Sequence, residues 1–275
     1  MTAVPFIVYF LLIAAAWYVI MRILPAVLSL LRRVGRGLAE GITRRGYVDK
    51  WFSFLPSSIL KLKPYGALIL IVVAGGGAAF VAGDQFFDVA ERLRTENETM
   101  LRIDQRVHEW TQENRYDFLT PFYLTFTIVG DPLGLTLILL IGIGVSLVRR
   151  DWSLAIYLTL TPALGGLLNR WLKHLFGRER PDLILAISDA AHQSFPSGHT
   201  MGSVLVLGAL AYGSLRLTTS WKWTSLWIAA AGISTLIIAL SRIYVGVHWI
   251  SDIAAGFAAG FAWLLTSIVV FEGYR

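Results

Sequence analysis

The sequence predicts an all-α, polytopic membrane protein, and three observations support this fold class. Hydrophobic residues make up 56% of the 275 residues and charged residues only 15%, whereas a soluble domain carries about 25% charged residues. Several apolar runs reach the length of about 20 residues that a bilayer-spanning helix needs. The basic residues also concentrate in one loop, as membrane topology demands. The number of spans is therefore more informative than the number of soluble domains.

Seven segments are apolar enough to be read as spans. They are 4–31, 65–83, 119–148, 152–172, 199–217, 224–242 and 249–271. The first is too long for a signal peptide and has no basic n-region, so we interpret it as a membrane anchor. We predict two parts of the chain: an N-terminal anchor with a basic cytoplasmic loop (1–64), and a six-helix membrane core (65–275) with a helical exoplasmic loop at 84–118.

The distribution of charge predicts the orientation in the membrane. The loop 32–64 holds eight basic residues and two acidic ones, and an excess of Lys and Arg is typical of cytoplasmic loops. Alternation then places 84–118 outside, and that loop holds nine acidic and five basic residues. Residues 173–198 and 243–248 also fall on the exoplasmic side.

Composition excludes some classes of site. The chain has no cysteine, which rules out disulfides and thiolate metal sites. The net charge of +6 reflects the basic loop rather than a nucleic-acid-binding surface. The sequence carries no indication of an oligomeric state.

The first of three polar segments is Lys173–Pro181 (KHLFGRERP). An intramembrane charge is costly, so such residues near the bilayer need a reason. Lys173 and Arg180 flank a turn at Gly177, and two cations held this way can clamp a dianion, with Arg binding in a bidentate manner. Taken alone, the pair also fits the common role of basic residues as interfacial anchors.

The second segment is Pro196-Ser197-Gly198-His199, immediately before an apolar run. Ser197 is a suitable N-cap, and Gly198 lets the backbone approach a ligand closely. The free N–H groups of a helix start favour an oxyanion there. A capped helix with an incidental histidine is the alternative.

The third segment, Ser241–Asp252 (SRIYVGVHWISD), contains Arg242, His248 and Asp252. His248 and Asp252 are four residues apart and thus share a face at a helix start. An Asp that accepts from one imidazole nitrogen fixes the tautomer and leaves the other nitrogen for a substrate. A single His–Asp pair is more often structural, but the predicted topology places this pair on the same side of the membrane as the other two segments.

As an ordered triple, Lys173-x6-Arg180-Pro181, Pro196-Ser197-Gly198-His199 and Ser241-Arg242-x5-His248-x3-Asp252 resemble the complete signature of the type 2 phosphatidic acid phosphatase superfamily. The similarity covers roughly residues 65–271. Each motif is weak singly and specific in combination.

The resemblance implies a role for each motif residue. His248 would be the nucleophile that forms a phosphohistidine, Asp252 would orient it, and His199 would protonate the leaving group and then activate water. The phosphoryl oxygens would be bound by the remaining motif residues: Lys173, Arg180, Ser197, Gly198 and Arg242. No cofactor and no metal are implied, because fixed cations supply the charge that Mg²⁺ supplies elsewhere.

We therefore expect an integral membrane phosphatase that acts on lipid phosphates or isoprenoid diphosphates, in a bacterial inner membrane with the site facing the periplasm. Its partners would be the lipid substrate and the bilayer, with no nucleic acid. A phosphotransferase that uses the same residues and, from another class, a non-catalytic lipid transporter or scaffold are the alternatives. Asp131-Pro132 is expected to start or kink a helix in a structural role, Asn169 to bond between helices, and Arg178 to lie outside the catalytic set.

Overall fold

The structure, a computed structural model, describes residues 71–181, 193–218 and 220–274. Within these ranges every regular element is a helix, so the predicted fold class is confirmed. In chain order the elements are η2 (Ile71–Gly75), α5 (Gly76–Arg94), α6 (Glu98–Glu113), α7 (Thr120–Gly130), α8 (Pro132–Val148), α9 (Trp152–Phe176), α10 (Gly198–Leu217), α11 (Trp221–Tyr244) and α12 (Ile250–Tyr274). The expected anchor 4–31 and basic loop 32–64 lie outside the described residues.

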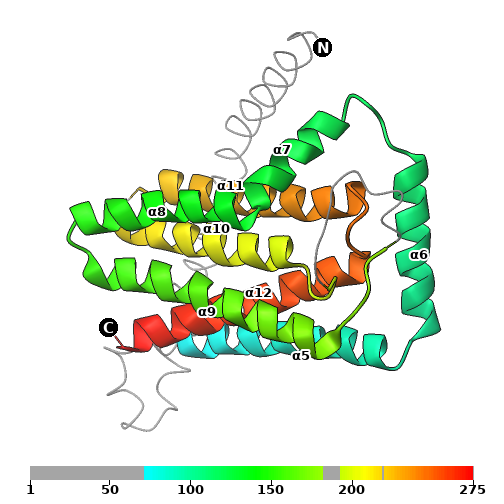
Figure 1. Cartoon of the computed structure of the whole chain (residues 1–275). Coiled ribbons are helices and arrows are strands. Elements are labelled where there is room, and N and C mark those ends of the chain that lie inside the picture. Colours follow the sequence, from blue (N-terminus) through cyan, green and yellow to red (C-terminus); the bar gives the residue numbers. More distant parts are fainter. Residues whose placement is uncertain (1–70, 182–192, 219, 275) are drawn as a thin grey trace, which may run out of the picture. The chain divides into compact units, whose positions relative to one another are not determined.

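Helix α10 is the centre of the bundle. It contacts α7, α8, α9, α11 and α12, while α5 packs along α12 (Figure 1). Helix α6 stands across one end of the bundle and contacts α11 and α12. This is the end at which α9 and α11 finish and α10 and α12 begin.

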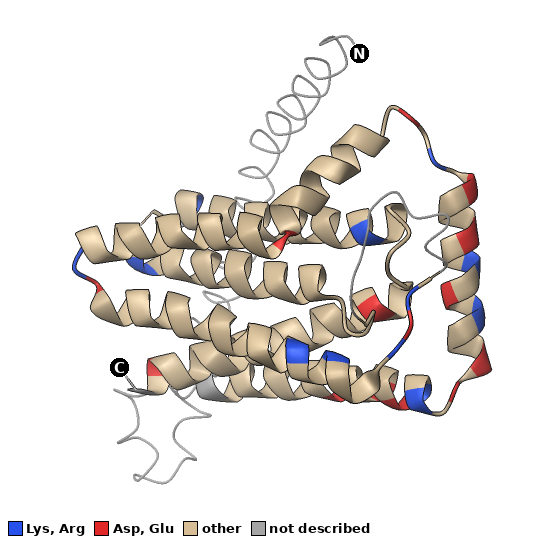
Figure 2. Ribbon diagram, in the orientation of Figure 1, with Lys and Arg blue, Asp and Glu red and all other residues tan. Residues whose placement is uncertain are grey.

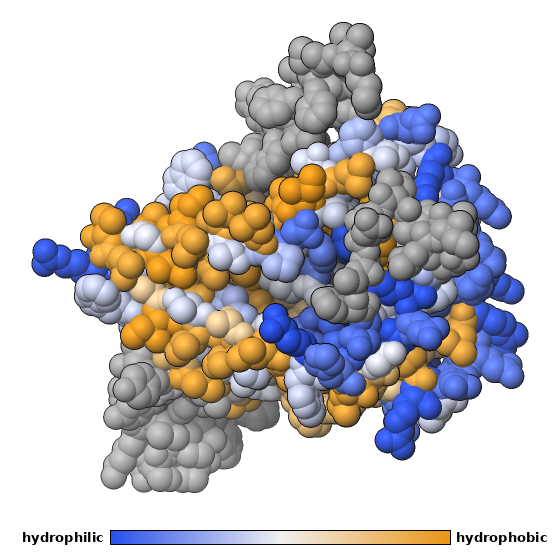
Figure 3. Space-filling model, viewed as in Figure 1, coloured by the Kyte–Doolittle hydropathy of each residue, from blue (hydrophilic) through white to orange (hydrophobic). Residues whose placement is uncertain are grey.

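The flanks of the bundle are apolar, as a membrane protein requires. Figure 3 shows hydrophobic residues along the bundle and hydrophilic residues gathered towards α6. Large apolar side chains such as Ile141, Trp152 and Leu167 are more than half exposed. Three helices, Gly198–Leu217, Lys222–Tyr244 and Ile250–Gly273, are long and apolar enough to cross a bilayer. They match the last three expected spans, and the protein is an integral membrane protein.

The expected span 119–148 is not one straight helix. Its two halves, α7 and α8, are bent by 59° relative to each other. Neither helix alone is long enough to cross a bilayer, but the bent pair together is long and apolar enough. Asp131 at the break is extended, with φ −64° and ψ 152°. Because Pro132 disfavours a helical residue before it and lacks an N–H, it ends α7 and starts α8. The expected span 65–83 differs too: α5 continues to Arg94, beyond the apolar run.

Glycines on α12 bring it close to α10. A Cβ atom built on Gly256 would lie 3.0 Å from the carbonyl oxygen of Ser197. On Gly260 it would lie 2.9 Å from Cβ of Val204. The Gly256-x3-Gly260 spacing puts both glycines on one face, as in close helix pairs of membrane proteins. The start of α10 is thereby held against the start of α12.

We expect Gly260→Ala to separate α10 from α12, because the stiff side chain of Val204 leaves no room for a methyl group. Such overpacking lowers stability by about 1–3 kcal/mol, which thermal unfolding of the purified protein in detergent measures. The matched control is Gly166→Ala on α9, where nothing lies within 4 Å of the added atom. Equal melting temperatures for the two variants would contradict this account of the contact.

Candidate active site

All eight predicted site residues lie at the end of the bundle that α6 covers. Helix α9 ends at Gly177, which adopts the left-handed conformation (φ 58°) that ends helices and turns the chain. The chain then reaches the start of α10 at Gly198, and the short turn between α11 and α12 returns to the same place. The three motifs, widely separated in sequence, thus meet in space.

His248 and Asp252 form the predicted pair. Nδ1 of His248 lies 3.2 Å from Oδ2 of Asp252, and their side chains are 2% and 0% exposed. The same Oδ2 accepts the backbone N–H of Trp249 at 3.0 Å. The carboxylate therefore holds both the imidazole and the chain that leads into α12.

Arg180 determines which nitrogen of His248 carries the proton. Its Nη1 lies 3.3 Å from Nε2 of His248 and donates to the carbonyl of Val247 at 2.7 Å. Because a guanidinium has donors only, Nε2 must accept. The proton of the neutral ring then sits on Nδ1, where it is donated to Asp252. Nε2 therefore carries the lone pair that a nucleophile towards phosphate requires.

Lys173 and Arg180 converge, as the first motif predicts. Nζ of Lys173 donates to the carbonyl oxygen of Gln193 at 2.5 Å, and Nη2 of Arg180 lies 3.5 Å from the same oxygen. Both side chains are partly buried. Two cations within reach of one oxygen atom, beside Nε2 of His248, form a clamp for an anion.

Arg242 is the most buried cation of the site, at 3% exposure. Its Nε and Nη1 atoms are buried and have no hydrogen-bond partner among the described residues. Buried guanidinium donors are costly unless something accepts from them. An anionic ligand with several oxygens would satisfy these donors.

The second motif starts α10 as predicted. Ser197 is the N-cap, and its Oγ accepts from the backbone N–H of Thr200. Its own N–H donates to the carbonyl of Asp252 at 3.1 Å, which ties α10 to α12. At Gly198 a Cβ atom would lie 3.2 Å from Oδ1 of Asn169 and 3.8 Å from Cε of Lys173. Gly198 thus leaves room for the side-chain oxygen of Asn169.

His199 has a carboxylate partner that the sequence interpretation treated as structural. Its Nε2 lies 2.6 Å from Oδ1 of Asp131, at the break between α7 and α8. The two side chains are 15% and 46% exposed. The kink at Pro132 therefore has a second consequence, because it turns a carboxylate towards the site. The helix-breaking Asp-Pro pair between two apolar runs was the available signal.

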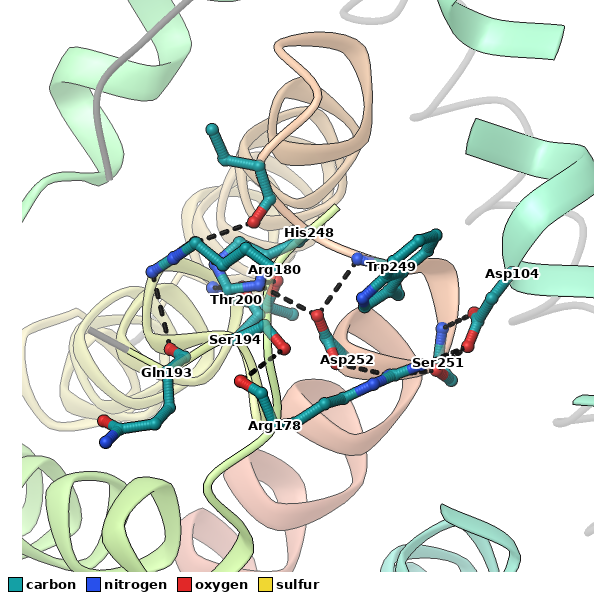
Figure 4. A network of polar contacts seen from close by, with 12 residues as sticks. Asp104, Arg178, Arg180, Gln193, Ser194, Thr200, His248, Trp249, Ser251 and Asp252 are labelled. Carbon is teal, nitrogen blue, oxygen red and sulfur yellow. Dashed lines mark hydrogen bonds and ion pairs between the residues drawn. The ribbon is translucent and has the colours of Figure 1, made fainter. Parts of the chain in front are cut away.

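The sequence interpretation also left Arg178 outside the site, although it contacts Asp252. Its side chain is 9% exposed and donates to Oδ1 of Asp252 at 2.7 Å and to Oδ2 of Asp104 at 2.6 Å (Figure 4). Asp104 comes from α6, more than 70 residues earlier, so no local spacing could have indicated the contact. The signal for Arg178 was its place beside Gly177, where the helix ends and the chain turns.

Charge is concentrated where these residues lie. Figure 2 shows Lys, Arg, Asp and Glu at the ends of the bundle and along α6, with few in between. Within the described ranges there is no group of three or more His, Cys, Asp or Glu side chains suited to a metal ion. The donors that converge here are instead cations and backbone N–H groups, which suit an anion.

Comparison with known proteins gives a consistent result. Residues 154–274 match the PAP2 superfamily. Phosphatidylglycerophosphatase B of Bacillus subtilis is 33% identical over 127 residues, which cover 46% of this chain and 62% of the relative. Lipid A 1-phosphatase of Rhizobium johnstonii is 36% identical over 126 residues, which cover 41% of this chain and 46% of the relative. The chain thus spans less than two thirds of the length of these relatives.

A solved structure extends the similarity beyond the matched segment. The crystal structure of a transmembrane PAP2 type phosphatidylglycerolphosphate phosphatase from Bacillus subtilis has a TM-score of 0.66 and 25% identity to this chain. The match covers 72% of this chain and 98% of that one. The helical arrangement described above is therefore that of a known membrane protein fold.

We expect the burial of His248 to make the protein acid-sensitive. Burial, and then the charges of Arg180 and Lys173, hold the pKa of His248 well below its ordinary value of 6.5. As the pH falls through 6.5, the unfolded chain takes up this proton before the folded protein does. The contribution to stability is complete above pH 6.5 and declines below it, by up to about 1.4 kcal/mol per pH unit.

Thermal unfolding in detergent between pH 8 and pH 5 measures this effect. The wild type should lose stability more steeply below pH 6.5 than His248→Gln does. His174→Gln, a change at an exposed position, serves as the control and should follow the wild-type curve. If His248→Gln also follows the wild-type curve, the buried imidazole is not the source of the acid sensitivity.

Proposed function

Residues 154–274 of this chain match the PAP2 superfamily, and from this similarity we propose that the protein is a membrane phosphatase acting on lipid phosphates or isoprenoid diphosphates. One observation carries the proposal: Nε2 of buried His248 lies beside the donor Nη1 of Arg180, with Nδ1 held by Asp252. Relatives with phosphatase names support the reaction class. The exposed apolar flanks support a lipid as the carrier of the phosphate.

In the first step of the proposed mechanism, Nε2 of His248 attacks the phosphorus atom. A P–N bond forms, the P–O bond to the lipid breaks, and the leaving oxygen takes a proton from His199. The ring of His248 gains positive charge in this step, and Asp252 stabilises it through the Nδ1–H bond. Asp131 holds the ring of His199 in place by the 2.6 Å contact.

In the second step, water releases the phosphate. His199, now neutral, accepts a proton from a water molecule as its oxygen attacks phosphorus. The P–N bond breaks and returns its electron pair to Nε2 of His248, so both histidines end as they began. A lipid hydroxyl in place of water would give phosphotransfer with the same residues.

The phosphoryl group would be bound by the cations of the three motifs. Lys173 and Arg180, which now share the Gln193 carbonyl, and the buried Nε and Nη1 of Arg242 would donate to its oxygens. Gly198 would add its backbone N–H, and Ser197 its hydroxyl hydrogen, since Oγ acts only as an acceptor in its bonds with Thr200. Fixed cations of this kind stabilise the transition state without a metal.

We place this site at the exoplasmic face of a bacterial inner membrane. The basic loop 32–64 supports a cytoplasmic position for the opposite side. The helix α6, with acidic residues along it, covers the site end of the bundle. Lipid headgroups would reach the site sideways from the outer leaflet.

The proposed chemistry can be tested directly. Purified wild-type protein, with a metal chelator present, should release inorganic phosphate from at least one member of a panel of lipid phosphates and diphosphates. We expect His248→Ala to lower the rate by about 10³-fold or more, because the variant lacks the proposed phosphoryl acceptor. His174→Ala should retain activity. Wild-type activity in His248→Ala would refute the nucleophile, and phosphate appearing only on a second lipid would indicate transfer.

The orientation in the membrane can be tested separately. Arg149 and Arg150 follow α8 at the end of the bundle away from the site. A reporter enzyme fused after Arg150 should be active in the cytoplasm, whereas one inserted after Asn97, in the turn before α6, should be active outside. The opposite pattern would place the site on the cytoplasmic face.

A further inference from the structure

Helix α6 lies on the bundle with polar side chains facing inwards. Its buried residues are Asp104, His108 and Thr111, which are 2%, 5% and 8% exposed. Ile103 and Trp110, by contrast, are half exposed or more. A helix at a protein surface normally buries an apolar stripe. The polar stripe therefore indicates that α6 is held by specific contacts, and these contacts lead to the site.

Asp104 holds the first turn of α12. Its Oδ1 accepts the backbone N–H of Ser251 at 2.9 Å, and its Oδ2 accepts the hydroxyl of Ser251 at 2.6 Å. Ser251 is the second residue of α12, so its N–H has no acceptor within the helix. A carboxylate at this position also suits the positive end of the helix dipole. The helix that carries Asp252 is thus fixed from α6.

Asp104 reaches Asp252 by a second route. The guanidinium of Arg178 uses Nη2 for Asp104 at 2.6 Å and Nη1 for Oδ1 of Asp252 at 2.7 Å. Trp249 lies against the same guanidinium, with its ring centroid 5.5 Å from Cζ, and also against His108, 5.5 Å between ring centroids. Figure 4 shows Arg178 between the two carboxylates.

From these contacts we propose that Asp104 is a positioning residue for the phosphoryl-accepting imidazole of His248, acting through Arg178 and Ser251. The proposal rests on the function proposed above for His248. Asp104 itself touches neither His248 nor the cation clamp. Its position on α6 lies outside the segment 154–274 that matches the superfamily.

The geometry explains why a second carboxylate is needed. Arg178 engages Oδ1 of Asp252 and leaves Oδ2 to face Nδ1 of His248. If Arg178 loses Asp104, its Nη2 has no carboxylate to hold it, and Nη1 is left with Oγ of Ser251 and Oδ1 of Asp252, both on a helix turn that Asp104 no longer fixes. Asp252 can then turn, and Nε2 of His248 moves away from the line of attack. A misplacement of about 1 Å at a reacting atom costs about 10²-fold in rate.

The test compares two identical changes, Asp104→Asn and Asp88→Asn. Asp88 is also paired with an arginine, Arg92 at 3.0 Å, but is half exposed on α5. We expect Asp104→Asn to lower kcat by about 10- to 100-fold, with KM and inhibition by inorganic phosphate within about twofold of wild type, because the clamp is intact. Asp88→Asn should match the wild type throughout.

A double-mutant cycle separates positioning from general loosening. Arg178→Lys keeps the charge but cannot bridge both carboxylates. If Asp104 acts through Arg178, then Asp104→Asn should lower kcat by less than about threefold in the Arg178→Lys background. A purely structural contribution would give independent, multiplicative losses, and that result would overturn the proposal.

A spectroscopic readout is independent of activity. The ¹⁵N resonances of His248, identified by their absence in His248→Gln, report which ring nitrogen carries the proton. Asp104→Asn should weaken the bond from Nδ1–H to Asp252 and so shift the Nδ1 resonance, whereas Asp88→Asn should not. If the wild type is active and Asp104→Asn changes neither the resonances nor kcat, the positioning role of Asp104 is refuted, while the proposed function stands. If the wild type releases no phosphate, the proposed function is refuted. The effect of Asp104→Asn on the His248 resonances then shows by itself whether Asp104 positions the imidazole.

Discussion

The carboxylate of Asp252 is fully buried, and its contacts come from three separate parts of the chain. Its side chain accepts from Trp249 and Arg178 and faces His248, while its backbone carbonyl accepts from Ser197. A buried charge is tolerated only when it is paired and hydrogen-bonded in this way. The start of α12 and the turn after α9 must therefore meet at this carboxylate, and the bond from Ser197 to the backbone carbonyl brings the start of α10 to the same place. The site follows from the need to satisfy this carboxylate.

The sequence is informative wherever the chemistry depends on local spacing. Ser197 before an apolar run predicts a capped helix, and the structure has that cap. The four-residue spacing of His248 and Asp252 predicts their contact, which is formed at 3.2 Å. Hydropathy predicts the three spans that follow residue 198. These features need only neighbouring residues, so helix periodicity and capping rules suffice.

The sequence is uninformative where the partner comes from a distant segment. Asp104 is one of nine acidic residues in its loop, and only the packing of α6 across the bundle end distinguishes it from the rest. Arg178 resembles an interfacial anchor until its two carboxylate partners are known. Asp131 was predicted to kink a helix, which it does, but the direction of the kink decides that it meets His199. Such contacts depend on tertiary structure, which no local pattern encodes.

The two histidines differ in how their carboxylate partners are held, and the difference fits two roles. His248 and Asp252 are almost completely buried and are fixed by Arg178, Trp249 and the start of α12. A nucleophile needs this rigidity, because it must keep one line of attack on phosphorus. His199 and Asp131 are 15% and 46% exposed, beside a break between two helices. A general acid that later takes a proton from water must exchange with solvent. The proposed mechanism thus needs one closed and one open His–Asp pair, and α6 covers the closed pair through the contacts of Asp104 and His108.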